Sequence, residues 1–215
     1  MTRLVVVRHA ESEGNFLREF HGQYNSDITE KGHVQAECTA KFLDGVKIDK
    51  IYSSDIKRAY STAKHVADRK GLEIIKDEGL REIFAGEWER KSFYALPEEY
   101  PELFEKWKTH KSQCTLPGGE SVSHLAHRII NEFEKIAREN EGKTVLVVTH
   151  ATPIASLICL WKGKELSYMD DTPWAANASV SIVDYIKDGE YKIEMLAYSE
   201  HLEKEGLLTT LPKSV

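Results

Sequence analysis

The sequence contains little cysteine: three residues among 215, with no CxxC spacing. Cys38, Cys114 and Cys159 are odd in number and lie far apart, which excludes a disulfide framework and a zinc site built from paired cysteines. We expect all three to be reduced thiols that fill space as small apolar residues do. This use of cysteine favours the cytoplasm as the location of the protein.

Long apolar runs and an excess of positive charge are also missing. The longest apolar stretch, at residues 154–161, is far shorter than the roughly 20 residues that span a bilayer. Charged residues interrupt the N-terminal apolar run almost at once, so we expect neither a secretory signal nor a membrane partner. The formal net charge of −6 argues against nucleic acid as a partner.

What remains has the composition of an ordinary globular protein. Hydrophobic residues make up 41% of the chain and charged residues 30%, enough for a core and a solvated surface. The sequence shows no internal repeat, low-complexity tract or linker. We therefore predict one domain over residues 1–215.

The first predicted strand leads directly into polar residues. The apolar run at residues 4–7 is followed by Arg8 and His9 without a linker. Such a short run of branched residues is typical of a strand buried on both faces, and ligands of open α/β sheets bind just outside the carboxyl ends of these strands. Arg8 and His9 are thus suited to an anionic ligand, and the histidine also to acid, base or nucleophilic chemistry. The alternative is that the two residues merely cap the strand.

A second strand repeats this arrangement. Residues 144–148 form another continuous β-branched run, which ends at Thr149 and His150. Pro153 then indicates the first turn of a helix, whose N-terminus attracts anions. Two histidines at equivalent strand ends can flank one phosphoryl group.

Helix and strand signals alternate along the rest of the chain and predict an α/β fold. The predicted helices span residues 29–44, 56–70 and 121–140, and the predicted strands span residues 51–53 and 72–76. Residues 179–186 and 191–197 flank Asp188-Gly189, a strong hairpin signal. We expect a mostly parallel central sheet flanked by helices, with this hairpin at the C-terminal end. Residues 83–116, rich in aromatic and charged side chains, are expected to form a partly helical, lid-like insertion over the site.

Several short motifs accompany the two histidines in a fixed order that covers almost the whole chain. They are Val7-Arg8-His9-Ala10-Glu11-Ser12 with Gly14-Asn15, Ser53-Ser54-Asp55 with Arg58-Ala59 and Thr62-Ala63, Leu80-Arg81-Glu82-Ile83 with Gly86-Glu87-Trp88-Glu89, Pro117-Gly118-Gly119-Glu120-Ser121, Val148-Thr149-His150 and Asn177-Ala178-Ser179. Together they resemble the histidine phosphatase superfamily, in its phosphoglycerate-mutase-like branch. The resemblance implies the phosphoglycerate-mutase-like fold and an enzyme that transfers phosphoryl groups.

Phosphoryl transfer requires that charge on the moving group be neutralised and that the reacting atoms be held in line. The resemblance and this requirement together imply that Arg8 and Arg58 donate hydrogen bonds to the phosphate, and that His150 is a further donor. His9 is the expected nucleophile, forming a phosphohistidine that water hydrolyses. Glu82 is the expected proton donor to the leaving oxygen and later the base for water. These groups take the place of a metal, so no metal or cofactor is expected.

Some of these assignments have competitors. Asn15 and Gln23 are weaker candidates for phosphate or substrate contacts. The alternative role of Arg58 is to pair with Asp55 on the surface. The alternative for Glu82 is that it is a solvated loop carboxylate without a catalytic role. Glu87 and Glu89 are alternative candidates for the proton donor. We expect the remaining histidines on the surface or in helices; they are at positions 21, 33, 65, 110, 124, 127 and 201.

Three functions compete. Cofactor-dependent mutases of this family follow the acid glutamate with Arg-His-Tyr-Gly, whereas Glu82 is followed by Ile83-Phe84-Ala85-Gly86. This difference favours a metal-independent hydrolase of a small phosphorylated metabolite. A phosphoglycerate mutase is the alternative, and a non-catalytic protein that binds a phospho-ligand is a remote one. The sequence identifies neither the leaving group nor the oligomeric state.

Overall fold

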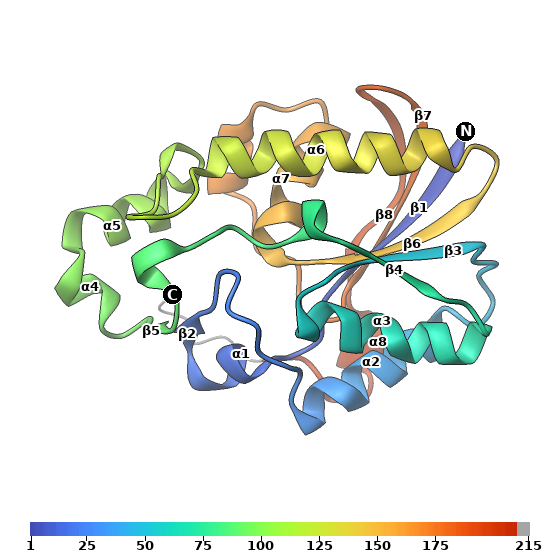
Figure 1. Ribbon diagram of the computed structural model, residues 1–215, viewed down its shortest axis with the longest axis horizontal. Helices are drawn as coiled ribbons and strands as arrows, with labels where there is room; N and C mark the ends of the chain where they lie inside the picture. The colour runs from blue at the N-terminus through green and yellow to red at the C-terminus, as the bar shows by residue number, and fades with distance from the viewer. Residues whose placement is uncertain (210–215) are drawn as a thin grey trace.

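A six-stranded sheet in the order β4-β3-β6-β1-β7-β8 forms the centre of the computed structural model, which describes residues 1–209 (Figure 1). Residues 210–215 of the predicted domain lie outside the described part. The first four strands in this order are parallel, and β7 and β8 add an antiparallel hairpin. The strands of this sheet are β1 (Thr2–Arg8), β3 (Lys50–Ser54), β4 (Ile74–Asp77), β6 (Thr144–Thr149), β7 (Val180–Lys187) and β8 (Glu190–Tyr198).

Helices cover both faces of the sheet. In Figure 1, α6 and α7 lie on one face, and α2, α3 and α8 lie on the other. The helices are α1 (Glu13–Leu17), α2 (Glu30–Phe42), α3 (Lys57–Lys70), α4 (Leu96–Glu99), α5 (Pro101–Thr109), α6 (Val122–Glu139), α7 (Ala151–Trp161) and α8 (Glu200–Glu203). Short 3₁₀ turns are η1 (Glu78–Leu80), η2 (Gly86–Trp88), η3 (Lys111–Gln113) and η4 (Leu166–Asp170). The predicted α/β fold with a mostly parallel sheet and a C-terminal hairpin is thereby confirmed.

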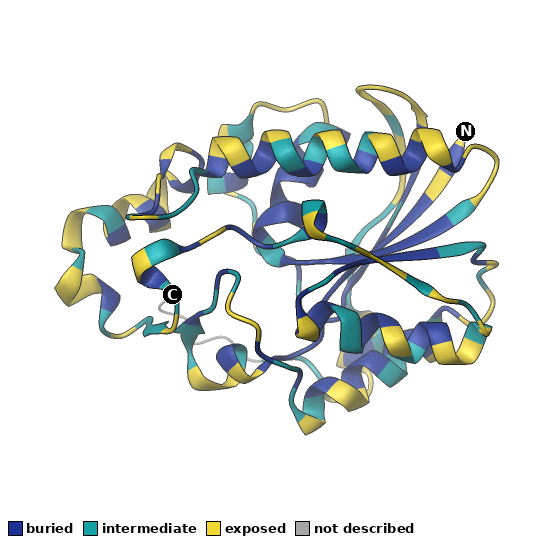
Figure 2. Ribbon diagram, viewed as in Figure 1, coloured by how far each residue is buried: buried dark blue, intermediate teal, exposed yellow. Residues whose placement is uncertain are grey.

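The apolar run of β1 explains why the strand lies in the middle of the molecule. Successive side chains of a strand point to opposite faces, so Leu4 and Val6 pack beneath α6 and α7. Val5 and Val7 pack against α2 and α3 instead. All four are at most 1% exposed, and burying each side chain stabilises the fold by about 1.5–3 kcal/mol. Figure 2 shows the central strands as mostly buried and the outer helix faces as exposed.

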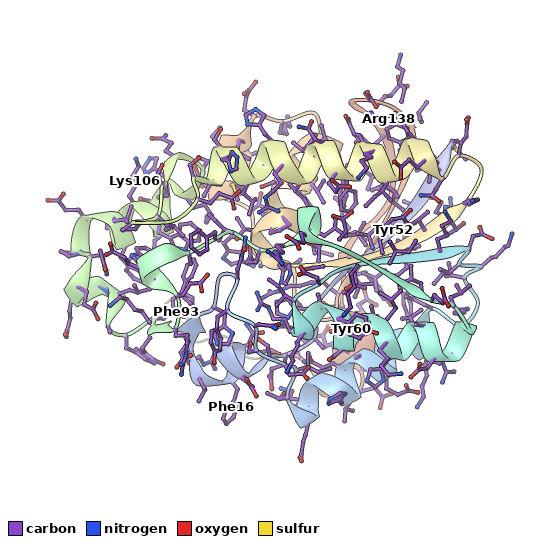
Figure 3. The ribbon with its side chains drawn as sticks, viewed as in Figure 1. Phe16, Tyr52, Tyr60, Phe93, Lys106 and Arg138 are labelled. Carbon is purple, nitrogen blue, oxygen red and sulfur yellow. The ribbon has the colours of Figure 1, made fainter. Side chains whose placement is uncertain are left out.

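The helix boundaries follow local chemistry. The Thr29 side chain accepts a hydrogen bond from the Gly32 amide at the start of α2, as its N-cap role predicts. Gly71 ends α3 with a φ of +66°, a left-handed conformation that favours glycine. At the far end of α6, Asn140 donates to the Tyr52 hydroxyl, 3.2 Å away, and Figure 3 shows Tyr52 between this helix and the sheet.

The predicted insertion at residues 83–116 contains η2, β5 (Lys91–Ser92), α4, α5 and η3. It is joined to the segment after β1 by a two-stranded sheet, in which β5 pairs with β2 (Glu19–Phe20). In Figure 1 the insertion lies at the end of the molecule toward which β1 and β6 run. It therefore stands beside the carboxyl ends of these strands.

Candidate active site

Two histidines meet where β1 and β6 end. The strands are parallel neighbours with Arg8 opposite Thr149, so the next residue of each strand, His9 and His150, emerges at the same edge. The two ring centroids lie 5.1 Å apart, and both side chains are buried, at 4% and 0% exposed. The sequence prediction that these histidines lie together is thus matched by their positions.

The His9 ring is held in one orientation by its own backbone. Nδ1 lies 2.8 Å from the Ala10 carbonyl oxygen, which accepts hydrogen bonds only, so Nδ1 carries the proton. Burial lowers the pKa of His9 well below 6.5, and the charges of Arg58 and Arg8 lower it further. The ring is therefore neutral near pH 7, and its Nε2 is unprotonated and available as a nucleophile.

His150 is bound at only one ring nitrogen. Its Nε2 lies 2.9 Å from the Ser54 hydroxyl at the end of β3. Nδ1 is buried and has no hydrogen-bond partner among the described residues. Burial, and after it the Arg58 charge, lowers the pKa of His150 well below 6.5. This nitrogen is therefore free to bind a further group, and its ring lies beside that of His9.

Two buried arginines supply the positive charge. Arg8 donates through Nη1 to the Ala175 carbonyl at 2.5 Å, while its Nε has no partner within residues 1–209. Arg58 donates to the Gly22 and Tyr24 carbonyls at 2.7 and 2.9 Å. Burial lowers the pKa of each arginine to about 10, so both stay charged at neutral pH.

The surface role considered for Arg58 is wrong. The Arg58 side chain is only 2% exposed. Asp55, its supposed surface partner, is bound instead by the guanidinium of Arg81. Arg58 therefore faces the pocket described below.

Glu82 lies against the N-terminus of α7. One carboxylate oxygen accepts from the Ile83 amide at 2.8 Å and the other from the Thr152 amide at 3.3 Å. The residue is 9% exposed, so it is not a solvated loop carboxylate. Its two competitors are occupied elsewhere: Glu87 accepts from the Tyr100 hydroxyl and Glu89 from a backbone amide.

The two weaker candidates occupy different positions. Asn15 lines the pocket, where its oxygen accepts from Ser12 and from the Asn177 amide at 3.0 Å. Gln23 does not line it, and its amide nitrogen donates to the Glu82 carbonyl at 3.0 Å. Gln23 thus contacts the backbone that carries the proposed acid.

His21 is a pocket residue that we expected on the surface or in a helix, and this expectation was wrong. Its side chain is 9% exposed, with Nδ1 2.7 Å from the Ser26 hydroxyl and Nε2 3.3 Å from the Glu19 carboxylate. Burial, followed by the charges of Arg58 and Arg90, lowers its pKa to about 4. No local pattern distinguishes it from the other histidines of the sequence.

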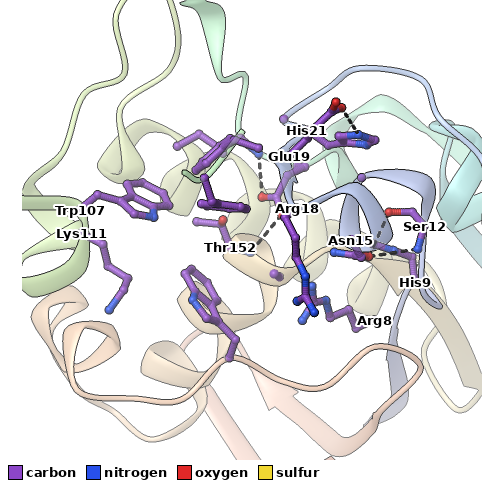
Figure 4. A pocket seen from close by; sticks show the side chains of 18 of the residues that line it. Arg8, His9, Ser12, Asn15, Arg18, Glu19, His21, Trp107, Lys111 and Thr152 are labelled. Atoms are coloured by element: carbon purple, nitrogen blue, oxygen red, sulfur yellow. Dashed lines mark hydrogen bonds and ion pairs between the residues drawn. The ribbon is translucent and has the colours of Figure 1, made fainter. Parts of the chain in front are cut away.

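Six of these residues line a pocket of about 630 Å³, shown in Figure 4: Arg8, His9, Asn15, His21, Arg58 and Glu82. His150 and Gln23 do not line it. Sequence reasoning missed Arg18, Lys111 and Trp174, which line it from three separate segments. Over residues 1–209, no cluster of three or more His, Cys, Asp or Glu side chains is arranged to hold a metal ion.

Comparison with known proteins gives consistent matches. A family model described as histidine phosphatase superfamily (branch 1) matches residues 4–197. Phosphoserine phosphatase 1 of Hydrogenobacter thermophilus is 35% identical over 186 residues, which are 85% of this chain and 86% of that protein. The metal-independent phosphoserine phosphatase of Arabidopsis thaliana is 30% identical over 211 residues, 97% and 86% of the two chains. The solved structure of Bacillus stearothermophilus YhfR has a TM-score of 0.89 at 29% identity and covers 94% of this chain and 100% of its own.

Proposed function

The chain belongs to branch 1 of the histidine phosphatase superfamily and is a phosphomonoester hydrolase; from this premise, we propose that His9 is the nucleophile of a reaction that uses no metal. The observation that carries the proposal is the bond from His9 Nδ1 to the Ala10 carbonyl. In a neutral buried ring this bond leaves the Nε2 lone pair free to attack phosphorus.

In the first step, His9 Nε2 bonds to phosphorus as the bond to the ester oxygen breaks. Arg8 and Arg58 line the pocket with His9, and the His150 ring centroid lies 5.1 Å from that of His9. We propose that these three residues neutralise the charge on the phosphoryl oxygens. Glu82 would supply the proton that the leaving alcohol needs. In the second step Glu82 takes a proton from water, which attacks the phosphohistidine and releases phosphate.

We further propose that the substrate is a small phosphorylated compound, as the names of the phosphatase relatives indicate for those proteins. The whole chain is proposed to act as one domain, with residues 83–116 covering the site. No helix of the described chain is both long and apolar enough to cross a membrane. The three cysteines are free, and we propose a cytoplasmic location on that ground.

The test is to trap the intermediate. The enzyme is mixed with a monoester labelled at phosphorus, and the reaction is stopped in alkali, in which phosphohistidine is stable. We expect label on the peptide that contains His9, and both label and turnover should disappear in His9→Ala. His127→Ala, which removes an exposed histidine of α6, is the matched control and should keep both. Label on a serine or cysteine, or an active and folded His9→Ala protein, would contradict the proposal.

A further inference from the structure

The pocket extends well beyond the groups that hold the phosphoryl. In Figure 4, Trp107 and Lys111 lie on the side of the pocket away from His9 and Arg8. The volume of about 630 Å³ is within the range of about 300–1,000 Å³ typical of sites for drug-sized ligands. The large apolar side chains that line it are those of Phe20, Ile83, Phe93, Phe104, Trp107 and Trp174. A phosphate group alone needs none of them.

One aromatic wall is fixed by packing behind it. Trp88 is fully buried, and its ring contacts Phe20 and Trp107 with centroids 5.3 and 6.0 Å away. Phe20 and Trp107 also meet each other edge to face at 5.2 Å. Because these rings are already ordered, a ligand that packs on them loses little affinity to the ordering of side chains.

The opposite wall is held by hydrogen bonds between the insertion and η4. The Lys111 ammonium donates to the Met169 and Asp170 carbonyls at 3.2 and 2.8 Å. The Ser112 hydroxyl donates to the Asp170 carboxylate at 2.7 Å. Lys111 also lies over the ring of Trp174, 5.8 Å from its centroid, and Trp174 lines the cavity.

Charges in this outer part of the pocket balance. On the side of Trp107, the cationic residues are Lys108 and Lys111, and the acidic residues are Asp170 and Asp171. With two of each sign, this part of the pocket offers little net attraction to a second anionic group. Apolar contact is therefore the main interaction that the outer pocket provides.

Resting on the proposed hydrolytic chemistry, we propose that the preferred substrates are phosphomonoesters whose leaving alcohol carries an uncharged aromatic group of about two rings. The phosphoryl end binds between the histidines and arginines, and the leaving group packs between Trp107 and Trp174.

The test compares 1-naphthyl phosphate with phenyl phosphate, whose leaving groups differ in size but little in acidity. We expect kcat/KM to be about tenfold higher for the naphthyl ester, because the second ring adds on the order of 60 Å² of apolar surface at about 25 cal/mol/Å². 1-Naphthol should also inhibit more strongly than phenol. Equal kcat/KM and equal inhibition would overturn the inference, while hydrolysis of both esters would still uphold the proposed function.

Trp174→Ala should reduce the naphthyl-to-phenyl ratio of kcat/KM toward one, and Trp174→Phe should restore much of it. Tyr94→Ala is the matched control, because Tyr94 is 64% exposed and does not line the pocket. It should leave the ratio unchanged. A ratio that survives in Trp174→Ala contradicts the inference, as does one lost equally in Tyr94→Ala. Failure of the wild type to hydrolyse any monoester would instead overturn the proposed function, and the inference with it.

Discussion

The buried position of His21 predicts a specific dependence of stability on pH. In the folded chain its pKa is lowered to about 4, whereas in the unfolded chain it returns to about 6.5. The unfolded state therefore binds a proton more readily between these two values. The contribution of His21 to stability is fully present above pH 6.5 and is lost as the pH falls toward 4.

The size of the effect follows from the two pKa values. At pH 5.5, an unfolded His21 is mostly protonated and a folded one is mostly neutral. The resulting loss in the free energy of unfolding is about 1.4 kcal/mol relative to pH 7.5, since each pKa unit is worth about 1.36 kcal/mol. His21→Gln removes this titration, so the stability difference between the wild type and the variant should shrink by that amount.

The assay is urea unfolding of both proteins at pH 7.5, 6.5 and 5.5, in buffers without phosphate. His127→Gln is the matched control, because it removes an exposed histidine of α6, and its stability difference from the wild type should not change with pH. A constant difference between the wild type and His21→Gln across this range would refute the reasoning. It would mean that the ring is not desolvated in the folded state.

Three further predictions concern the reaction. Glu82→Gln should slow hydrolysis of alkyl phosphates by about 10²–10⁴-fold and of aryl phosphates much less, because acidic phenols leave without a proton; a uniform loss would remove Glu82 from that role. Activity should survive exhaustive EDTA treatment, and vanadate should compete with substrate for the site of Arg8 and Arg58, whereas a strict requirement for Mg²⁺ or Zn²⁺ would contradict the account. With 3-phosphoglycerate and catalytic 2,3-bisphosphoglycerate, free phosphate should exceed 2-phosphoglycerate, because charges in the outer pocket balance; isomerisation that outruns hydrolysis by orders of magnitude would identify a mutase.

The sequence predicts the structure well where the structure depends on residues close together along the chain. Buried parallel strands need continuous apolar runs, so residues 4–7 and 144–148 are recognisable and locate Arg8, His9 and His150 at their ends. Parallel pairing then brings these ends together without further information. The hairpin at Asp188-Gly189 was predictable for the same reason, because its turn chemistry is local.

The rest depends on contacts between distant segments. Trp174 and Lys111 meet only because the loop after η4 folds against the insertion. His21 and Gln23 lie two residues apart in one loop, and only the folded loop shows that His21 lines the pocket and Gln23 does not. The group that orients His9 is a backbone carbonyl, which every residue possesses and no residue type reveals.

The two ends of the pocket come from separate parts of the chain, and this has a consequence for evolution. His9, His150 and Arg58 stand at the ends of β1, β6 and α3, whereas most of the aromatic wall comes from the insertion and from the loop that carries Trp174. Mutations in those outer segments can reshape the leaving-group pocket without moving the strands that hold His9 and His150. A lineage built on this plan can therefore acquire new substrates in small steps while its chemistry is inherited intact.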